Sequence, residues 1–155
     1  LVPQIVRAAP SPPSQIHVFN SSFIIPNGVF RWTINTVTFE SFAYDPILQR
    51  LARGEDIPPM RTAVITAGLE VLDIVVQNLQ GADHPFHLHD YNFWVLSSGN
   101  GTITPEEAGQ LQHNLTNPLR RDTITVAPGT WQVLRVVTDI PGTHFCSPHS
   151  STEPC

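Results

Sequence analysis

The stretch His84-Pro85-Phe86-His87-Leu88-His89 determines how the rest of this sequence is interpreted. On a β-strand, residues two apart lie on the same face, so His87 and His89 point the same way. His84 stands three positions before His87, on the opposite face or in the preceding turn. Pro85 holds His84 in an extended or turn backbone, because proline restricts the residue before it. The stretch therefore offers one imidazole on one side and a pair on the other.

Histidines in this arrangement are candidate metal ligands. Copper, zinc and iron all accept imidazole nitrogens. The alternative is a set of surface or hydrogen-bonded histidines, which fits a lone histidine well. It fits poorly here, because three histidines fall within six residues, beside apolar Phe86 and Leu88 and before Phe93-Trp94-Val95-Leu96. We therefore interpret His84, His87 and His89 as ligands.

Short apolar segments separated by Gly and Pro turns surround this stretch, which is typical of β-proteins. Strands are expected at residues 16–19, 29–39, 63–66, 70–78, 86–97, 122–126 and 131–138. Short helices are expected only at 46–53 and 105–109. Within 70–78, Leu72, Ile74 and Val76 alternate with Asp73, Val75 and Gln77. The pattern predicts an all-β antiparallel sandwich or barrel.

Composition narrows the class of protein further. The chain has 155 residues, 41% of them hydrophobic, which suits one domain with a real core. Its net charge is −5 and its basic residues form no run, which excludes a typical nucleic-acid binder. No apolar run reaches the roughly 20 residues that a membrane span needs. No signal peptide is visible and residue 1 is Leu, so we expect the chain to begin inside a longer precursor. Sequons at Asn20, Asn100 and Asn114 slightly favour a secreted glycoprotein.

Several segments together resemble one family. The pattern His-Pro-x-His-x-His before an aromatic-rich strand resembles a copper motif of multicopper oxidases, especially fungal laccases. Residues 27–35 resemble the start of that family's third domain, 117–126 its Asn-Pro-x-Arg-Arg-Asp-Thr segment, and 131–142 the strand before its last copper motif. The resemblance covers residues 15–142 and implies a Greek-key cupredoxin (plastocyanin-like) β-sandwich with copper as cofactor. Residues 1–14 are then a linker or an extended crossing segment.

The resemblance also implies a role for each histidine. His84 binds the type-1 copper, which takes electrons from a phenolic or similar reductant. His87 binds the type-2 copper and His89 one of the type-3 pair, and these three ions form the trinuclear centre that reduces dioxygen to water. The implied partners are sister cupredoxin domains, a small phenolic or aromatic reductant and O2. The parent family is secreted.

Two features depart from the family pattern. Asp90 stands where the family usually has Gly, so its carboxylate either strains the turn or serves as an acceptor near the ligands. After Gly142 the family continues to His-Cys-His-x-x-x-His, whereas this chain reads Phe145-Cys146-Ser147-Pro148-His149. Residues 143–155 are therefore an atypical tail. We expect the domain to lack its last strand and C-terminal helix, and the trinuclear centre cannot be completed from it.

Two explanations of the tail stay open. It is a wrong continuation, such as a retained intron or a frameshift, or it is real and supplies Cys146 and His149 to a His2Cys type-1 site with His84. A disulfide between Cys146 and Cys155 is another possibility, and His144 is a candidate displaced ligand. Three functions follow: an oxidase domain active only with its sister domains, a mononuclear blue-copper electron-transfer module, or a copperless remnant.

Other residues are assigned structural roles. Trp32, Trp94 and Trp131 are expected in the core. His17 and His113 are expected on the surface, and Arg120-Arg121-Asp122 is expected to form an ion pair with backbone contacts.

Overall fold

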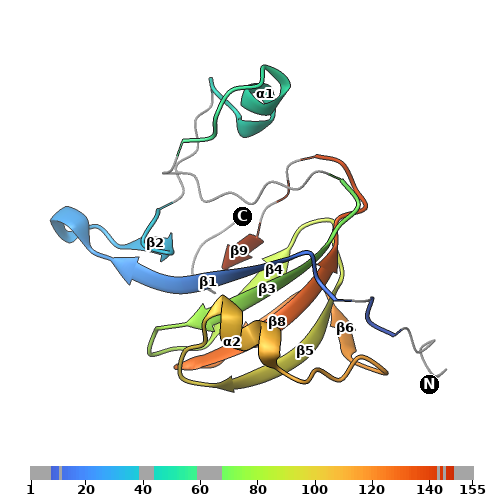
Figure 1. Ribbon diagram of the computed structural model, residues 1–155. Helices are drawn as coiled ribbons and strands as arrows, with labels where there is room; N and C mark the ends of the chain where they lie inside the picture. The colour runs from blue at the N-terminus through green and yellow to red at the C-terminus, as the bar shows by residue number, and fades with distance from the viewer. Residues whose placement is uncertain are drawn as a thin grey trace, which may run out of the picture.

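The computed structural model describes residues 8–10, 12–38, 44–58, 68–142, 144 and the backbone of 146–148. This part of the chain forms nine strands and two short α-helices (Figure 1). The strands are β1 (Gln15–Ile24), β2 (Arg31–Ile34), β3 (Val71–Asn78), β4 (His84–Leu88), β5 (Phe93–Asn100), β6 (Leu119–Arg121), β7 (Thr123–Val126), β8 (Thr130–Val137) and β9 (Cys146–Pro148). The helices are α1 (Ile47–Ala52) and α2 (Pro105–Gln110), and a 3-10 turn, η1, covers Pro26–Gly28. Neither α-helix has the length and apolar character needed to cross a membrane.

The strands form two sheets, which confirms the all-β prediction. The larger sheet has six strands in the order β2-β1-β3-β8-β5-β6, and the smaller has three in the order β7-β4-β9. All described pairs are antiparallel except β1 and β3, which run parallel. The predicted ligand strand β4 is the central strand of the smaller sheet.

The six-stranded sheet buries apolar residues on both faces. Ile74 and Val76 join Phe86 of β4 and Val126 of β7 in a core between the two sheets. On the other face, Val75 packs with Trp94, Trp131 and Val133. The alternation predicted for residues 70–78 is therefore confirmed, and both sides of β3 are covered because it is central in the sheet.

The outer core is closed by α2 and by the chain before β1. A capping box starts α2, in which the Thr104 hydroxyl accepts from the Glu107 amide and the Glu107 carboxylate accepts from the Thr104 amide. Ala108 is buried beneath it. In the segment before β1, the Ala9 amide donates to the Leu115 carbonyl at 3.0 Å. Residues 8–10 thus pack against the sheet.

Two expected strands differ from the observed ones. The strand expected at 86–97 is divided by a turn at His89 and Asp90, so that β4 and β5 lie in different sheets. The strand expected at 29–39 ends at Ile34, because Asn35 and Thr36 both adopt a positive φ and turn the chain back on itself. The strand expected at 63–66 lies outside the described residues.

The chain after β8 also differs from expectation. The domain was expected to lack its last strand, but Cys146–Pro148 form β9, which pairs with β4. The exposed edge of β4 supplies unpaired backbone donors and acceptors, which explains why even three residues add to it. The region expected to lack a C-terminal helix, after Pro148, lies outside the described residues.

Candidate metal centre

Strand β4 holds His84 and His87 between two neighbouring strands, and His89 follows in the next turn. It pairs with β7 from His84 opposite Val126 to His87 opposite Thr123, and with β9 from Phe86 to Leu88. The loop that enters β4 is fixed by Asn78, whose side-chain amide donates to the Ala82 carbonyl at 2.8 Å and to the Val126 carbonyl at 2.9 Å. The backbone at His84 is therefore set by a buried hydrogen-bond network.

His84 lies on the inner face of β4. Its side chain is buried, with 6% of the residue exposed, and its Nε2 atom has no hydrogen-bond partner among the described residues. The Trp32 ring packs edge-on against the imidazole, with the ring centroids 4.5 Å apart. Burial lowers the pKa of His84, although the Asp83 carboxylate opposes this. The neutral imidazole, the form that binds metals, is thus favoured.

His87 and His89 lie on the opposite side and are close together. Their ring centroids are 4.8 Å apart. The Nδ1 atom of His87 is 3.0 Å from both the Asp122 carbonyl and the Thr123 hydroxyl. This contact orients the ring through one nitrogen, and such hydrogen bonds are common in histidines that bind metals through the other. His89 is exposed in the turn after β4.

The three histidines therefore belong to two separate candidate metal sites, one with His84 and one with His87 and His89. Phe86, between His84 and His87, belongs to the inter-sheet core, so the strand alternation puts His84 inside and His87 outside. Within the described residues, no group of three or more His, Cys, Asp or Glu side chains gathers around one point. Both places are incomplete in the described part of the chain.

The predicted ligands of the tail are only partly placed. The backbone of Cys146 lies in β9 directly opposite Leu88. His149 lies outside the described residues, as does Cys155. The His2Cys set and the alternative disulfide thus stay predictions.

Asp90 and His144 form a polar contact beside the ligand strand. The Nδ1 atom of His144 lies 3.0 Å from a carboxylate oxygen of Asp90, and its Nε2 atom lies 3.1 Å from the Ile140 carbonyl. Both ring nitrogens thus face acceptors. His144 is therefore not offered to a metal as a displaced ligand in this conformation.

Three structural features were missed or misjudged from sequence. Asp73 and Arg135 form a buried, two-bonded ion pair across β3 and β8, with both N–O distances 2.7 Å. His17 and His113 are half-buried rather than on the surface, and Nδ1 of His113 lies 3.2 Å from the Ser97 hydroxyl. The Arg120 guanidinium lies over the Trp94 ring, 5.0 Å from its centroid, and within the described part of the chain it forms no ion pair with Asp122. In the sequence, the only sign of the Asp73–Arg135 ion pair was a charged residue within each of two predicted strands.

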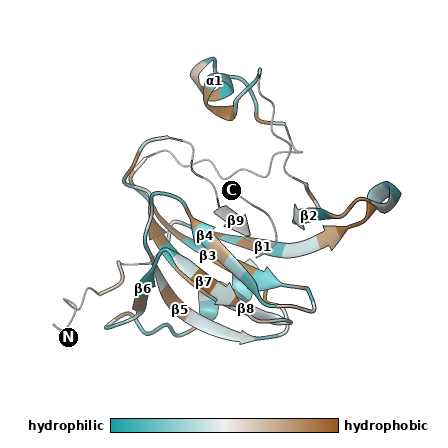
Figure 2. Cartoon of the chain, turned by 180° about the vertical axis from the view of Figure 1, so that it is seen from behind, coloured by the Kyte–Doolittle hydropathy of each residue, from teal (hydrophilic) through white to brown (hydrophobic). Residues whose placement is uncertain are grey.

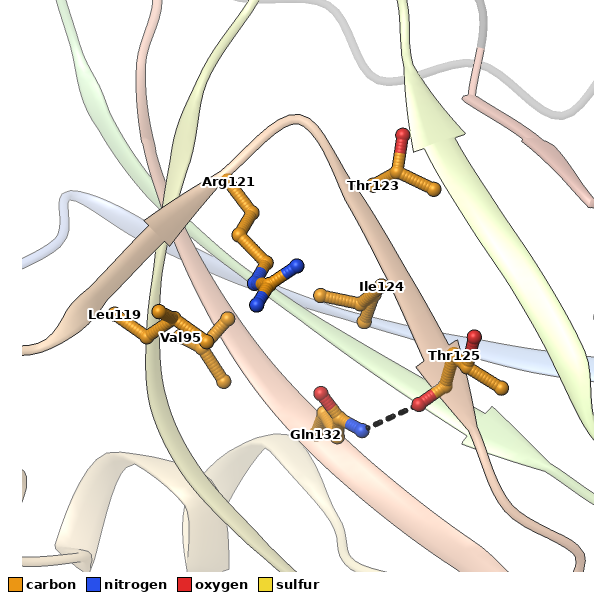
Figure 3. Close-up of a pocket in the computed structure, with 7 residues that line it drawn as sticks. All are labelled: Val95, Leu119, Arg121, Thr123, Ile124, Thr125 and Gln132. Atoms are coloured by element: carbon orange, nitrogen blue, oxygen red, sulfur yellow. Dashed lines mark hydrogen bonds between the residues drawn. The ribbon is translucent and has the colours of Figure 1, made fainter.

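A groove of about 380 Å³ opens elsewhere, where β6 turns into β7 (Figure 3). Arg121 reaches into it beside Val95, Leu119 and Ile124, and Gln132 donates to the Thr125 carbonyl at its floor. None of the described histidines lines this groove, but one lining residue, Thr123, contacts His87 through its hydroxyl at 3.0 Å.

Comparison with known proteins gives one consistent family. A family model described as "Multicopper oxidase" matches residues 13–152. Laccase-1 of Cryptococcus neoformans var. grubii is 34% identical over 149 residues, covering 92% of this chain and 24% of the relative. L-ascorbate oxidase of Cucurbita maxima is 30% identical over 169 residues, covering 86% of this chain and 29% of the relative. The chain thus spans about a quarter of the length of the curated relatives it matches.

Solved structures share the fold. The laccase from Botrytis aclada superposes with a TM-score of 0.73 at 26% identity, covering 92% of this chain and 26% of that one. Fet3p, described as a multicopper oxidase that functions in iron import, has a TM-score of 0.79 at 22% identity, covering 93% of this chain and 30% of that one.

Proposed function

This chain belongs to the multicopper oxidase family, and we propose that it is the third cupredoxin domain of a laccase-like oxidase that couples oxidation of a phenolic-type reductant to reduction of dioxygen to water. Copper is the cofactor of the family, and the resemblance to laccases is confirmed by the relatives. The observation that carries the proposal is that the histidines of β4 and of the turn after it lie on two sides, with His84 in the core and His87 beside His89. A single mononuclear copper site would use His84 but would leave the neighbouring pair, His87 and His89, unexplained.

The residues present fit copper. His84 offers a buried nitrogen that no described group satisfies, and a buried polar atom without a partner is costly unless a ligand takes it up. The ring of His87 is oriented by its Nδ1 contacts with the Asp122 carbonyl and the Thr123 hydroxyl, as the rings of metal-binding histidines often are. When bound, copper supplies the one-electron redox chemistry. The chain's own residues orient the imidazoles, and Trp32 and the inter-sheet core shield His84 from water.

We assign His84 to the type-1 site, with Cys146 and His149 as its further ligands. The register of β9 supports this assignment. Positions 84, 86 and 88 lie on the same face of β4, because residues two apart on a strand share a face. Cys146 is paired directly with Leu88, so position 146 falls on the face that carries His84. A cysteine and two histidines form the ligand set of blue-copper sites.

We assign His87 to the type-2 copper and His89 to the type-3 pair. Both lie at the periphery of the domain, and His89 is exposed, which suits a centre completed by a neighbouring domain. The partners proposed are therefore sister cupredoxin domains of a longer chain, whose curated relatives are about four times as long. We also propose that the protein is secreted and glycosylated, as the three sequons suggest.

Copper titration of the purified chain tests the site assignments. Copper retained after dialysis is measured by atomic absorption, and the thiolate-to-copper charge-transfer band is measured by visible spectroscopy. We expect the band in the wild-type chain and in His87→Asn/His89→Asn, and its loss in His84→Asn and in Cys146→Ser. His17→Asn, a partly buried histidine on β1, is the matched control and keeps the band. A wild-type chain that retains no copper overturns the assignments.

A further inference from the structure

The two departures from the family pattern touch each other. Asp90 replaces the usual glycine after the ligand strand, and His144 belongs to the atypical tail, 54 positions later. Their side chains meet at 3.0 Å, between Oδ2 of Asp90 and Nδ1 of His144. A continuation read in the wrong frame has no reason to supply a partner for Asp90, so this contact favours a native tail.

The backbone at Asp90 explains why a residue other than glycine is tolerated there. Its φ of +67° is in the left-handed region, where glycine is at ease and where Asp and Asn are the next best tolerated residues. The substitution thus keeps the turn after β4 and adds a carboxylate to it. That carboxylate is directed to the segment that leads into β9.

Further contacts hold His144 in place. Its Nε2 atom is 3.1 Å from the Ile140 carbonyl, and the Tyr91 ring packs edge-on against it with the centroids 4.7 Å apart. The Tyr91 hydroxyl donates to the same carbonyl at 2.7 Å and accepts from the Ile140 amide at 3.3 Å. We call Asp90, Tyr91, Ile140 and His144 the latch.

The latch lies in register with the β4–β9 ladder. Phe86 pairs with Pro148, His87 with Ser147 and Leu88 with Cys146. Each step forward on one strand is a step back on the other, so position 90 falls opposite position 144, two steps beyond the Leu88–Cys146 pair. The Asp90–His144 contact thus continues the ladder through side chains after the backbone pairing has ended.

We propose that Asp90 and His144 are positioning residues that fix the register of β9 on the ligand strand. Three paired residues specify a register weakly, and a slip of one residue would transfer Cys146 to the opposite face of the sheet. The latch opposes that slip, because a shifted β9 would break the hydrogen bond between His144 and Asp90. The consequence for copper rests on the proposed function, whereas the fixed register does not.

Hydrogen exchange of the complete chain without metal, followed by mass spectrometry, tests the latch. Asp90→Gly removes the carboxylate and relieves the backbone, and His144→Phe keeps the ring against Tyr91 but removes both nitrogens. We expect each to raise exchange in residues 144–148 about fivefold, as the loss of one side-chain hydrogen bond implies, while exchange in β3 and β8 stays unchanged. The double variant should exchange no faster than His144→Phe, because the contact that Asp90→Gly removes is already broken in His144→Phe. Asp90→Asn, which keeps an acceptor and tolerates the left-handed backbone, should stay close to wild type.

Unchanged exchange at residues 144–148 in both Asp90→Gly and His144→Phe overturns the latch. An equal rise in β3 also overturns it, because the effect is then global unfolding. Copper loading separates the two proposals. If the exchange results hold but the wild-type chain shows no thiolate-to-copper band, the assigned copper site fails and the latch stands. If the wild-type band is present, we expect it to weaken in Asp90→Gly.

Discussion

At the scale of single residues, the buried ion pair between Asp73 and Arg135 has the largest predicted effect on stability. Both side chains are almost fully buried, at 2% and 3% exposure, and Arg135 also donates to the Pro10 carbonyl. Asp73→Ala leaves the guanidinium buried without a countercharge. We expect the free energy of unfolding in urea to fall by about 3–5 kcal/mol.

The surface pair Arg53–Glu55 is the matched control for this prediction. Its side chains are 51% and 42% exposed, so Glu55→Gln should cost less than about 1 kcal/mol. Replacing both buried partners by Leu should restore much of the loss, since no uncompensated charge then remains. A loss in Asp73→Ala no larger than that in Glu55→Gln contradicts the assigned role.

The environment of His113 makes the free energy of unfolding depend on pH. Burial lowers its pKa below the usual 6.5, Arg135 adds to this and Asp73 opposes it. The unfolded chain therefore takes up a proton at a higher pH than the folded chain does. Stability from this group is complete above pH 6.5 and is lost as pH falls from there through the lowered folded pKa. His113→Asn, which can keep the bond to Ser97, should flatten the decrease in unfolding free energy between pH 7 and 5. An unchanged slope contradicts this.

At the scale of elements, the close packing of β5 against the Trp131 ring of β8 requires a glycine at position 99. Gly99 on β5 is opposite Trp131 on β8, and a Cβ atom at Gly99 would lie 2.7 Å from the indole Cε2 atom. Gly99→Ala therefore forces the ring out of its place in the outer core. We expect a loss of about 1–3 kcal/mol in thermal or urea unfolding. Gly81→Ala, whose Cβ meets nothing within 4 Å, is the control and should change stability little.

The elements also show what local pattern can and cannot predict. The buried strand at 70–78 was predicted because its apolar residues alternate over a long segment. The division of residues 86–97 into β4 and β5 was missed, because the turn depends on the left-handed backbone of Asp90, a residue without the usual glycine signal. β9 was missed because three residues carry no period, and it forms by adding to the edge of β4.

For the candidate site, the separation of His84 from His87 and His89 could be predicted, since alternation along one strand is a local property. Their roles as copper ligands stay predictions. The partners of the ligands were not predictable in the same way. Thr123 and the Asp122 carbonyl reach His87 only through the pairing of β4 with β7. Trp32 reaches His84 from a hairpin 52 positions earlier in the chain. Such contacts are set by the fold and not by spacing.

At the scale of the whole molecule, the β1–β2 hairpin exposes apolar segments on both sides of η1, which are brown in Figure 2, whereas η1 itself is teal. Ile25, Val29 and Phe30 are 56%, 55% and 49% exposed. Apolar residues gathered at one end favour association with another surface. We expect the chain alone to self-associate in sedimentation experiments, and Ile25→Ser/Val29→Ser to reduce this with little change in melting temperature. Leu119→Ser, 54% exposed on β6, is the control and should not reduce it.

Oxygen consumption is the property that depends most on the whole oxidase. His87 and His89 provide two neighbouring imidazoles, and a centre of three copper ions needs more ligands than the described residues bring together. We therefore expect the copper-loaded chain to show no oxygen uptake with a phenolic reductant above that of His87→Asn/His89→Asn, measured with an oxygen electrode. The double variant corrects for oxidation by loosely bound copper, because both chains carry the same remaining histidines. Uptake that the wild-type chain sustains and the variant loses would contradict the need for sister domains, and would mean that copies of this domain complete the centre among themselves.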